Sequence, residues 1–347
     1  MNNDAKHSVK GKTSAVTAAC ALACGLAGLL TSCSGRDTAT SDRETASEIL
    51  FADPTIYGEN GKYYLTGTRN ASPLGFVLLE SDDLVSWHDA MDSMLITPGE
   101  RVFGTQGFWA PQIIKNDEGG YTLAYTANEQ TVVAHADSLR SPFTQNEVKP
   151  VDGSEKNIDP FIFRDDDGKE YIYHVRFDHG NFLWVGEYDK ATGSIVEGTL
   201  KKCFANTQPW EHTGDYPSDP IMEGPTVIKL DGTYYLFYSA NHFMSRDYAV
   251  GYATAKSPAG PWTKNPDNPI IHRSIVGENG AGHGDIFTGT DGELRYVYHV
   301  HNSDSVVSPR RTRIVTLRLD PDKGNPSAPY KVTADSTTII KPLYASK

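Results

Sequence analysis

The sequence predicts an all-β fold, a five-bladed β-propeller, from three observations. Five segments share one layout, in which a short polar motif is followed by a turn and an aromatic-rich strand. These motifs recur 50 to 64 residues apart, and a repeat of about 40–50 residues with about four strands is the mark of a propeller blade. No long apolar stripe of helical period occurs after the N-terminal region, while Tyr (18), Phe (13) and Gly (31) are plentiful.

The five segments read as strand, tight turn and strand. They are ADPTIYGENGKYYLTG from Ala52, WAPQIIKNDEGGYTLAY from Trp109, IDPFIFRDDDGKEYIYH from Ile158, EGPTVIKLDGTYYLFYS from Glu223 and GHGDIFTGTDGELRYVYH from Gly282. Each contains a Gly at the turn, as in Asn60-Gly61 and Asp231-Gly232, which suits a hairpin that needs positive φ. Residues 164–168, RDDDG, could resemble a calcium loop, but they lack the EF-hand pattern and are interpreted as such a turn.

A third strand is expected after each of these units. The segments are 76–81, 131–138, 182–189, 248–255 and 312–320. We therefore assign residues 48–347 to one propeller. The alternative is a β-sandwich whose hairpins resemble one another by chance, but the recurrence of the same blocks in the same order argues against it.

The N-terminus reads as an export signal. Lysines precede the apolar run AVTAACALACGLAGLL, and LTSC then ends at Cys33, as in a bacterial lipobox. We expect residues 1–33 to be a lipoprotein signal peptide and the polar residues 34–47 to be a flexible tether. A plain signal peptide or a membrane-spanning anchor is the alternative, although a span needs about 20 apolar residues. The expected location is the bacterial cell envelope, lipid-anchored, on the periplasmic side or at the outer-membrane surface.

Charge and cysteine content exclude several functions. The formal net charge is −12, and the one Lys/Arg run is PRRTR at 309–313, so a nucleic-acid partner is not expected. Of the four Cys, Cys20 and Cys24 would leave with the signal, and Cys33 would be lipidated. Cys203 remains alone, which leaves no disulfide framework and no thiolate zinc site. A neutral ligand is compatible with this balance, and we expect a monomer whose membrane contact is the lipid on Cys33.

The repeat predicts a constellation of polar residues on the propeller axis. In a propeller, the first strand of each blade lines the central channel. The motif residues Asp53, Trp109, Asp159, Glu223 and His283 should therefore converge from five directions. A carboxylate such as Glu223, placed before a dense apolar strand, costs desolvation free energy unless it has a use.

The set ADPTI, WAPQI, IDPFIFRDDDG, EGPTVI and GAGHGDIF, in this order, resembles the blade motifs of glycoside hydrolase family 43 over most of residues 50–320. The resemblance implies Asp53 as the general base, Glu223 as the general acid and Asp159 as the residue that orients the acid and modulates its pKa. It also implies that His283 helps to hold a central metal ion, commonly calcium, or a water network, and it implies a sugar contact for Arg310 or Arg311. It implies no cofactor for the chemistry itself.

The chemistry of glycoside cleavage agrees with those roles. One carboxylic acid protonates the leaving oxygen while a carboxylate works on the opposite side, and a separation of about 6.5–9.5 Å gives inversion. A carboxyl group of Asp159 close to Glu223 would raise the pKa of the acid. Taken alone, each Asp-Pro motif could simply begin a strand.

Aromatic and histidine residues supply further candidates. Trp109 could stack on sugar or belong to the core. Residues 203–219 form the longest irregular insert, which we expect to border the pocket, with Trp210 and Glu211 contacting sugar. His299 and His301 alternate at a strand end and are weaker candidates.

The function expected is an inverting, exo-acting glycosidase on plant cell-wall pentose glycans. We favour α-L-arabinofuranosidase, followed by β-xylosidase, with an oligo- or polysaccharide as substrate. An endo-arabinanase, a galactan-cleaving enzyme and a carbohydrate-binding propeller without catalysis are alternatives. A retaining fructan hydrolase is disfavoured, because its Asn-Asp-Pro, Arg-Asp-Pro and Glu-Cys motifs are replaced by Ala-Asp-Pro, Ile-Asp-Pro and Glu-Gly-Pro.

Overall fold

The computed structural model describes residues 46–153, 156–323 and 328–346. The expected signal peptide, including Cys33, lies outside the described residues, as does most of the expected tether. Ser47, placed in the tether by the sequence, instead begins strand β1 (Ser47–Glu48). In the part of the chain that the structure describes, no helix has the length and apolar character needed to cross a membrane.

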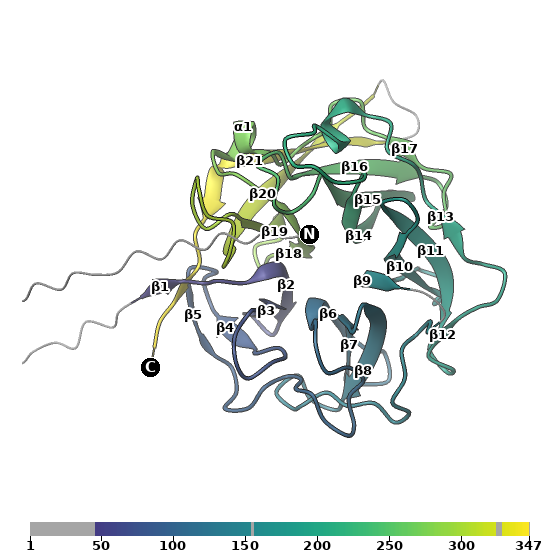
Figure 1. Ribbon diagram of the computed structural model, residues 1–347, viewed down its shortest axis with the longest axis vertical. Helices are drawn as coiled ribbons and strands as arrows, with labels where there is room; N and C mark the ends of the chain where they lie inside the picture. The colour runs from purple at the N-terminus through teal and green to yellow at the C-terminus, as the bar shows by residue number, and fades with distance from the viewer. Residues whose placement is uncertain (1–45, 154–155, 324–327, 347) are drawn as a thin grey trace, which may run out of the picture. The chain divides into compact units, whose positions relative to one another are not determined.

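The described strands form five sheets, arranged as blades around one axis, and this confirms the predicted five-bladed propeller (Figure 1). Blade I contains β2 (Ala52–Glu59), β3 (Lys62–Thr68), β4 (Leu79–Ser81) and β5 (Ser86–Asp89). Blade II contains β6 (Trp109–Lys115), β7 (Tyr121–Ala127) and β8 (Gln130–Ala136). Blade III contains β9 (Asn157–Arg164), β10 (Glu170–Phe177), β11 (Asn181–Asp189), β12 (Ser194–Ile195) and β13 (Lys201–Lys202).

Blade IV contains β14 (Met222–Leu230), β15 (Thr233–Ala240), β16 (Ala249–Ala255) and β17 (Thr263–Lys264). Blade V contains β18 (Gly282–Thr288), β19 (Leu294–Val300), β20 (Arg311–Pro321) and β21 (Tyr330–Ile340). Two short helices, η1 (Pro209–Glu211) and α1 (Arg273–Val276), belong to connections between strands. The strands β2, β6, β9, β14 and β18 lie innermost in their blades.

The ring closes where the two ends of the domain meet. Strand β22 (Leu343–Tyr344) pairs parallel with β5, and β1 pairs antiparallel with β22, so the C-terminal segment extends blade I. Arg313 is fully buried beside this closure and bonds to Glu48 at 3.0 Å and to Glu278 at 2.7 Å. Arg311 forms ion pairs with the same two carboxylates. Of the two arginines considered for sugar contact, Arg311 therefore belongs to the ring closure.

Blade II has fewer than the expected four strands, because three strands are assigned to it among the described residues. The chain that follows β8 covers its edge instead. His135 and Thr144 exchange backbone hydrogen bonds of 2.8 and 2.9 Å, and Val151 donates to the carbonyl of Thr131 at 2.8 Å. An irregular segment thus protects the strand edge that a fourth strand would have paired.

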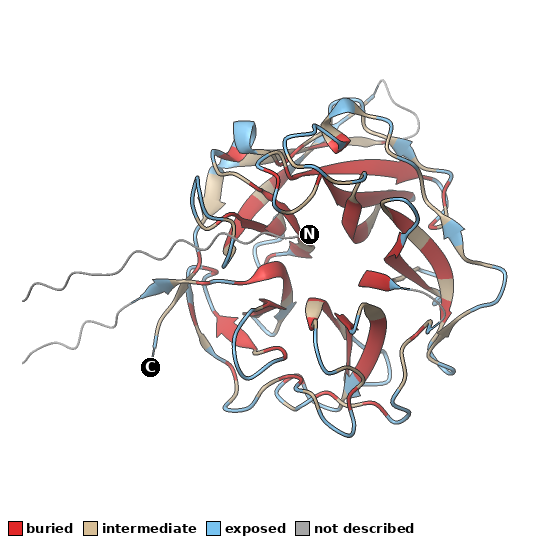
Figure 2. Cartoon of the chain, viewed as in Figure 1, coloured by how far each residue is buried: buried red, intermediate tan, exposed pale blue. Residues whose placement is uncertain are grey.

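The aromatic-rich second strands bury both of their faces, as the red central strands in Figure 2 show. On β15, Tyr235 and Phe237 pack into the core shared with blade V, whereas Leu236 and Tyr238 pack into the core shared with blade III. Successive strand residues point to opposite faces. Because each blade lies between two others, the YYLFY pattern needs large apolar side chains at every position.

Candidate active site

A shared backbone distortion places the motif residues at the axis. In each blade the first strand has a register shift against the second, at the motif. The residues in the left-handed region at these shifts are Asp53 (φ 47°), Ala110 (φ 46°), Asp159 (φ 55°), Gly224 (φ 60°) and His283 (φ 37°). Positive φ is costly for residues other than Gly. Bulges of this kind re-aim side chains beside functional sites.

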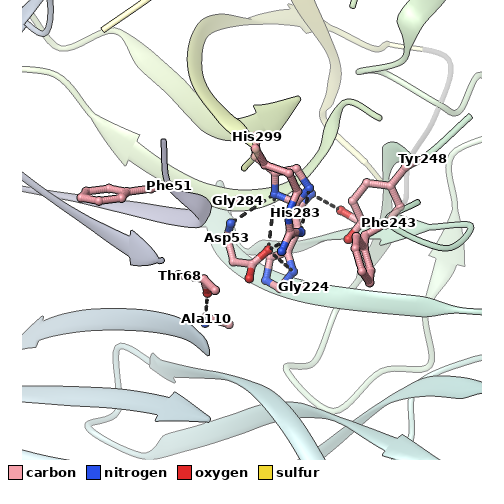
Figure 3. A network of polar contacts seen from close by, with 12 residues as sticks. Phe51, Asp53, Thr68, Ala110, Gly224, Phe243, Tyr248, His283, Gly284 and His299 are labelled. Atoms are coloured by element: carbon pink, nitrogen blue, oxygen red, sulfur yellow. Dashed lines mark hydrogen bonds and ion pairs between the residues drawn. The ribbon is translucent and has the colours of Figure 1, made fainter. Parts of the chain in front are cut away.

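Four of the bulges are fastened by a side chain of the preceding blade. The backbone N–H of Asp53 donates to Nδ1 of His299 at 3.1 Å, and that of Ala110 donates to Oγ1 of Thr68 at 2.9 Å (Figure 3). In the other two bulges, the backbone N–H of Asp159 donates to Oγ1 of Thr126 at 2.9 Å, and that of His283 donates to Oγ of Ser239 at 2.7 Å. The hydrogen bonds compensate backbone groups that the bulge removes from the sheet.

The positions of the bulges show which motif residues are structurally equivalent from blade to blade. Gly224 occupies in blade IV the position that Asp53 and Asp159 occupy in their blades, so Glu223 stands one residue earlier and is equivalent to Trp109. Ala110, rather than Trp109, holds the axial position of blade II. A Cβ atom on Gly224 would lie 2.6 Å from the ring of His283, and its φ of 60° is unfavourable for other residues. The Glu-Gly-Pro motif therefore places a carboxyl group beside a close approach that glycine alone allows.

A pocket of about 490 Å³ lies at the axis, where the motif residues meet. Its lining includes six of the residues singled out in the sequence, namely Asp53, Trp109, Asp159, Glu223, His283 and Arg310. The same pocket is lined by Thr68, Asn70, Glu129, Ile158, Phe177, Asn181, Ile221, His242, Phe243 and Ser308, so all five blades contribute. A concave site with a few convergent polar groups is what a small-molecule or glycan site requires.

Asp53 lies among a guanidinium group and two imidazole rings, those of His283 and His299, which Figure 3 shows beside it. Its Oδ1 accepts a hydrogen bond from Nη1 of Arg310 at 3.2 Å and lies 3.4 Å from Nδ1 of His283 and 3.3 Å from Nδ1 of His299. Burial alone would raise the pKa of Asp53, but the Arg310 charge, together with the histidines, holds that pKa well below its usual value. The Asp53 side chain is therefore ionised at neutral pH.

Glu223 has the opposite environment. Burial raises its pKa to about 7; a hydrogen bond from Tyr248 opposes the rise, and the charge of Asp53 adds to it. The Tyr248 hydroxyl donates to Oε1 of Glu223 at 2.7 Å. The main cause of the raised pKa of Glu223 is thus burial, and not the repulsion by Asp159 that the sequence led us to expect.

Asp159 is coupled to this group. Its Oδ2 accepts the backbone N–H of Gly224 at 3.3 Å, which ties it to the residue that follows Glu223. Burial raises the pKa of Asp159 well above its usual value, and the charges of Glu223 and Asp53 raise it further. Of these three carboxyl groups, Asp53 therefore favours the ionised form, whereas Glu223 and Asp159 favour a proton, which is the requirement of acid–base catalysis.

Sequence reasoning missed Tyr248 and underestimated His299. Tyr248 is fully buried, and its ring stacks on that of His299 with centroids 5.6 Å apart. His299 in turn lies 3.1 Å from Nη1 of Arg310, whose guanidinium lies 4.7 Å from the Phe243 ring centroid. His301 bonds to the carbonyl of Phe243 at 2.9 Å and so supports the same wall. No local motif marks Tyr248, because blade folding alone brings it to Glu223.

The structure does not bring Trp210 and Glu211 to this pocket. Trp210 packs on Tyr238 at 5.5 Å, donates to Gln208 at 2.7 Å and lines a different pocket. Glu211 is fully buried, accepts the Tyr238 hydroxyl at 2.7 Å and pairs with Lys264. The expected sugar contacts are thus replaced by packing within blade IV, since the turn of η1 directs both side chains inward.

The insert at 203–219 still reaches the site indirectly. The ring of Tyr216 stacks on His242 with centroids 4.3 Å apart, and His242 is one of the residues that line the pocket. Tyr216 therefore contacts a residue of the pocket lining without being part of that lining. The insert was expected to border the pocket directly.

Comparison with known proteins agrees with this geometry. A sequence profile described as "Glycosyl hydrolases family 43" matches residues 47–324. The chain belongs to this family. It is therefore a glycosidase, an enzyme class that hydrolyses glycosidic bonds, and the resemblance seen in the sequence motifs is confirmed.

Individual relatives of this family 43 protein differ in their named activities. The endo-1,4-β-xylanase structure from Bacteroides thetaiotaomicron is 35% identical, with a TM-score of 0.78, and the match covers 86% of this chain and 99% of that one. The β-D-galactofuranosidase xynD of Aspergillus niger is 26% identical over 76% of this chain and 78% of its own length. The xylan 1,3-β-xylosidase of a Vibrio species is 28% identical over 72% of this chain but only 47% of its own. The chain thus spans about half of that last relative.

Proposed function

We propose that the chain is an inverting, exo-acting glycosidase on plant cell-wall pentose glycans, with α-L-arabinofuranosides as first choice of substrate and β-xylosides as second. One observation carries the acid–base assignment. Asp53 and Glu223 line the same pocket, and their surroundings shift their pKa values in opposite directions. Two carboxyl groups separated in this way divide into base and acid.

In this mechanism Glu223 transfers its proton to the glycosidic oxygen as the bond from the anomeric carbon to that oxygen breaks. Asp53 takes a proton from a water molecule, whose oxygen attacks the anomeric carbon from the opposite face and inverts it. Arg310, bonded to Asp53, keeps the base ionised. Asp159, bonded to the backbone beside Glu223, orients the acid and modulates its pKa. Trp109 and Arg310 line the pocket and are the substrate-binding candidates that the structure retains.

The experiment that tests this function measures nitrophenol release from the α-L-arabinofuranoside and the β-xyloside. NMR of the first-formed sugar then reports the anomer. We expect one of the two glycosides to be cleaved with inversion. A retained anomer would contradict the assignment of Asp53 as base. No cleavage of either glycoside, nor of arabinan or galactan, would favour a carbohydrate-binding propeller.

The pH dependence should follow from the two shifted groups. The acid must be protonated and the base ionised in the free enzyme. Because the pKa of Glu223 is raised to about 7, kcat/KM should fall as pH increases above about 7. Because the pKa of Asp53 is held well below its usual value, the acidic limb should lie below the ordinary range of an aspartate. A pH–rate profile of kcat/KM checks both limbs, and a basic limb below pH 5 would contradict the assignment of Glu223.

Replacing Tyr248 by Phe should move the basic limb upward. The phenol stays protonated, because burial and then the charge of Glu223 raise its pKa well above 10, so it always donates to the carboxyl group. A donated hydrogen bond stabilises the carboxylate, and its loss raises the pKa of Glu223 by about one unit. Profiles of kcat/KM against pH for wild type and Tyr248→Phe measure the shift. A fall in rate with an unmoved limb would show that Tyr248 acts on packing alone.

The structure does not support direct ligation of calcium near His283. Calcium takes six to eight oxygen ligands, whereas the axial cavity beside His283 has a volume of about 20 Å³, enough for about one water molecule. Both carboxylate oxygens of Asp285 in its lining accept hydrogen bonds, from Thr55 at 2.7 Å and Thr226 at 2.6 Å. Among the described residues, no group of His, Cys, Asp and Glu side chains is arranged to hold a metal.

We further propose that the chain is a monomer anchored to the bacterial envelope by a lipid on Cys33. The support is the sequence LTSC that ends at Cys33, with the polar segment after it. Labelling with a radioactive fatty acid, for wild type and Cys33→Ser, tests the anchor, and equal labelling of the two would refute it. Light scattering of the solubilised protein tests the monomer, and a mass of two chains would refute that part.

A further inference from the structure

Phe177 is the one Phe, Tyr or Trp among the described residues whose side chain is exposed rather than buried or half-buried. Its exposed fraction is 41%, and it lines the same pocket as Asp53 and Glu223. The other aromatic residues of that pocket, Trp109 and Phe243, are half-buried. Leaving an aromatic face in water forgoes a large hydrophobic gain, so this ring is available to a ligand in the pocket.

The hairpin that carries Phe177 is hydrogen-bonded to the chain segment before Glu223. Phe177 ends β10 and pairs across the hairpin with Asn181 at the start of β11. The N–H of Asn181 donates to the carbonyl of Pro220 at 2.9 Å, and Asn181 also forms a bridge with Ile221. A Cβ atom on Gly180 would lie 2.4 Å from the Pro220 oxygen, so the hairpin contacts this chain segment closely. A platform for a ligand needs such a fixed support.

The segment that holds the hairpin leads directly into Glu223. Pro220 and Ile221 come three and two residues before it, and the Asn181 side chain hydrogen-bonds to Glu223 itself. Phe177 therefore belongs to the side of the pocket where Glu223 lies. At the other carboxyl group, Asp53, the bonded neighbour is the cationic Arg310.

We propose that Phe177 is the stacking platform for the leaving-group sugar, the residue of the glycan that follows the cleaved bond. This inference rests on the proposed function, in which Glu223 protonates the oxygen between the two sugars. The leaving group must then lie within reach of Glu223, beside the exposed ring. One face of a furanose or pyranose ring carries mainly C–H groups, which pack on an aromatic face.

The test compares two substrates of the same sugar, whichever of arabinose and xylose the wild type accepts. One is the disaccharide, whose leaving group is a sugar. The other is the glycosyl fluoride, whose leaving group has no ring to stack. In Phe177→Ala the ratio of kcat/KM for the disaccharide to that for the fluoride should fall roughly 5- to 10-fold, the size of a lost aromatic contact. Phe177→Trp should restore most of the ratio.

Met244→Ala provides a matched control, because Met244 has the same exposed fraction of 41% but is not part of the pocket lining. Its ratio should equal that of the wild type. An unchanged ratio in Phe177→Ala would overturn the inference, whether both rates fall together or neither falls. If the wild type cleaves neither substrate, the proposed function fails, and this subsite fails with it.

Discussion

Glu223→Gln is expected to lower kcat/KM for a disaccharide substrate by about 10²- to 10⁴-fold, the usual contribution of a general acid. Glutamine keeps the size of the side chain and can still accept the hydrogen bond of Tyr248 at Oε1. It cannot supply the proton that the leaving oxygen needs. The glycosyl fluoride provides the internal control, because fluoride leaves with little protonation.

The loss in Glu223→Gln should therefore be smaller for the fluoride than for the disaccharide by at least tenfold. Steady-state kinetics on both substrates measure the difference, and thermal unfolding checks that the fold is intact. Equal losses on both substrates would show that Glu223 is not the acid. In that case Asp159, whose pKa burial also raises, would be the next candidate.

Asp53→Asn is expected to lower kcat/KM by about 10²- to 10⁴-fold for both substrates alike. The base acts on the attacking water, which takes part whatever the leaving group is. Asparagine accepts a hydrogen bond from Arg310 but carries no charge, so it cannot remove the proton of the water molecule. The contrast between a substrate-dependent loss at Glu223 and a substrate-independent loss at Asp53 separates the two roles.

Asp285→Asn is the matched control for Asp53→Asn. Asp285 is another carboxyl group on the axis, but its two oxygens are bonded to Thr55 and Thr226, and it is not part of the pocket lining. We expect its kcat/KM to remain within a few-fold of wild type. Full activity in Asp53→Asn would contradict a base at Asp53. An equal loss in Asp285→Asn would assign the effect to axial packing instead.

The order of the blades and the position of the acidic motifs could be read from the sequence, because both depend on local patterns. Glycine turns such as Asn60-Gly61 join paired strands, and the aromatic runs become second strands that are buried on both faces. The resemblance of the motifs then pointed to Asp53, Asp159 and Glu223, which the structure places in one pocket. A repeat that specifies one hairpin per blade leaves little freedom in how the first strands converge.

What surrounds those carboxyl groups was decided by the tertiary structure alone. His299 is 246 residues from Asp53 in sequence, and Arg310 is 257 residues away, yet both contact it after the ring closes. Neighbouring arginines thus have different roles, Arg310 in the pocket and Arg311 in the ion pairs with Glu48 and Glu278. Trp210 turned inward and Phe177 remained exposed for the same reason: tertiary contacts, not local sequence, determine which side chains are buried.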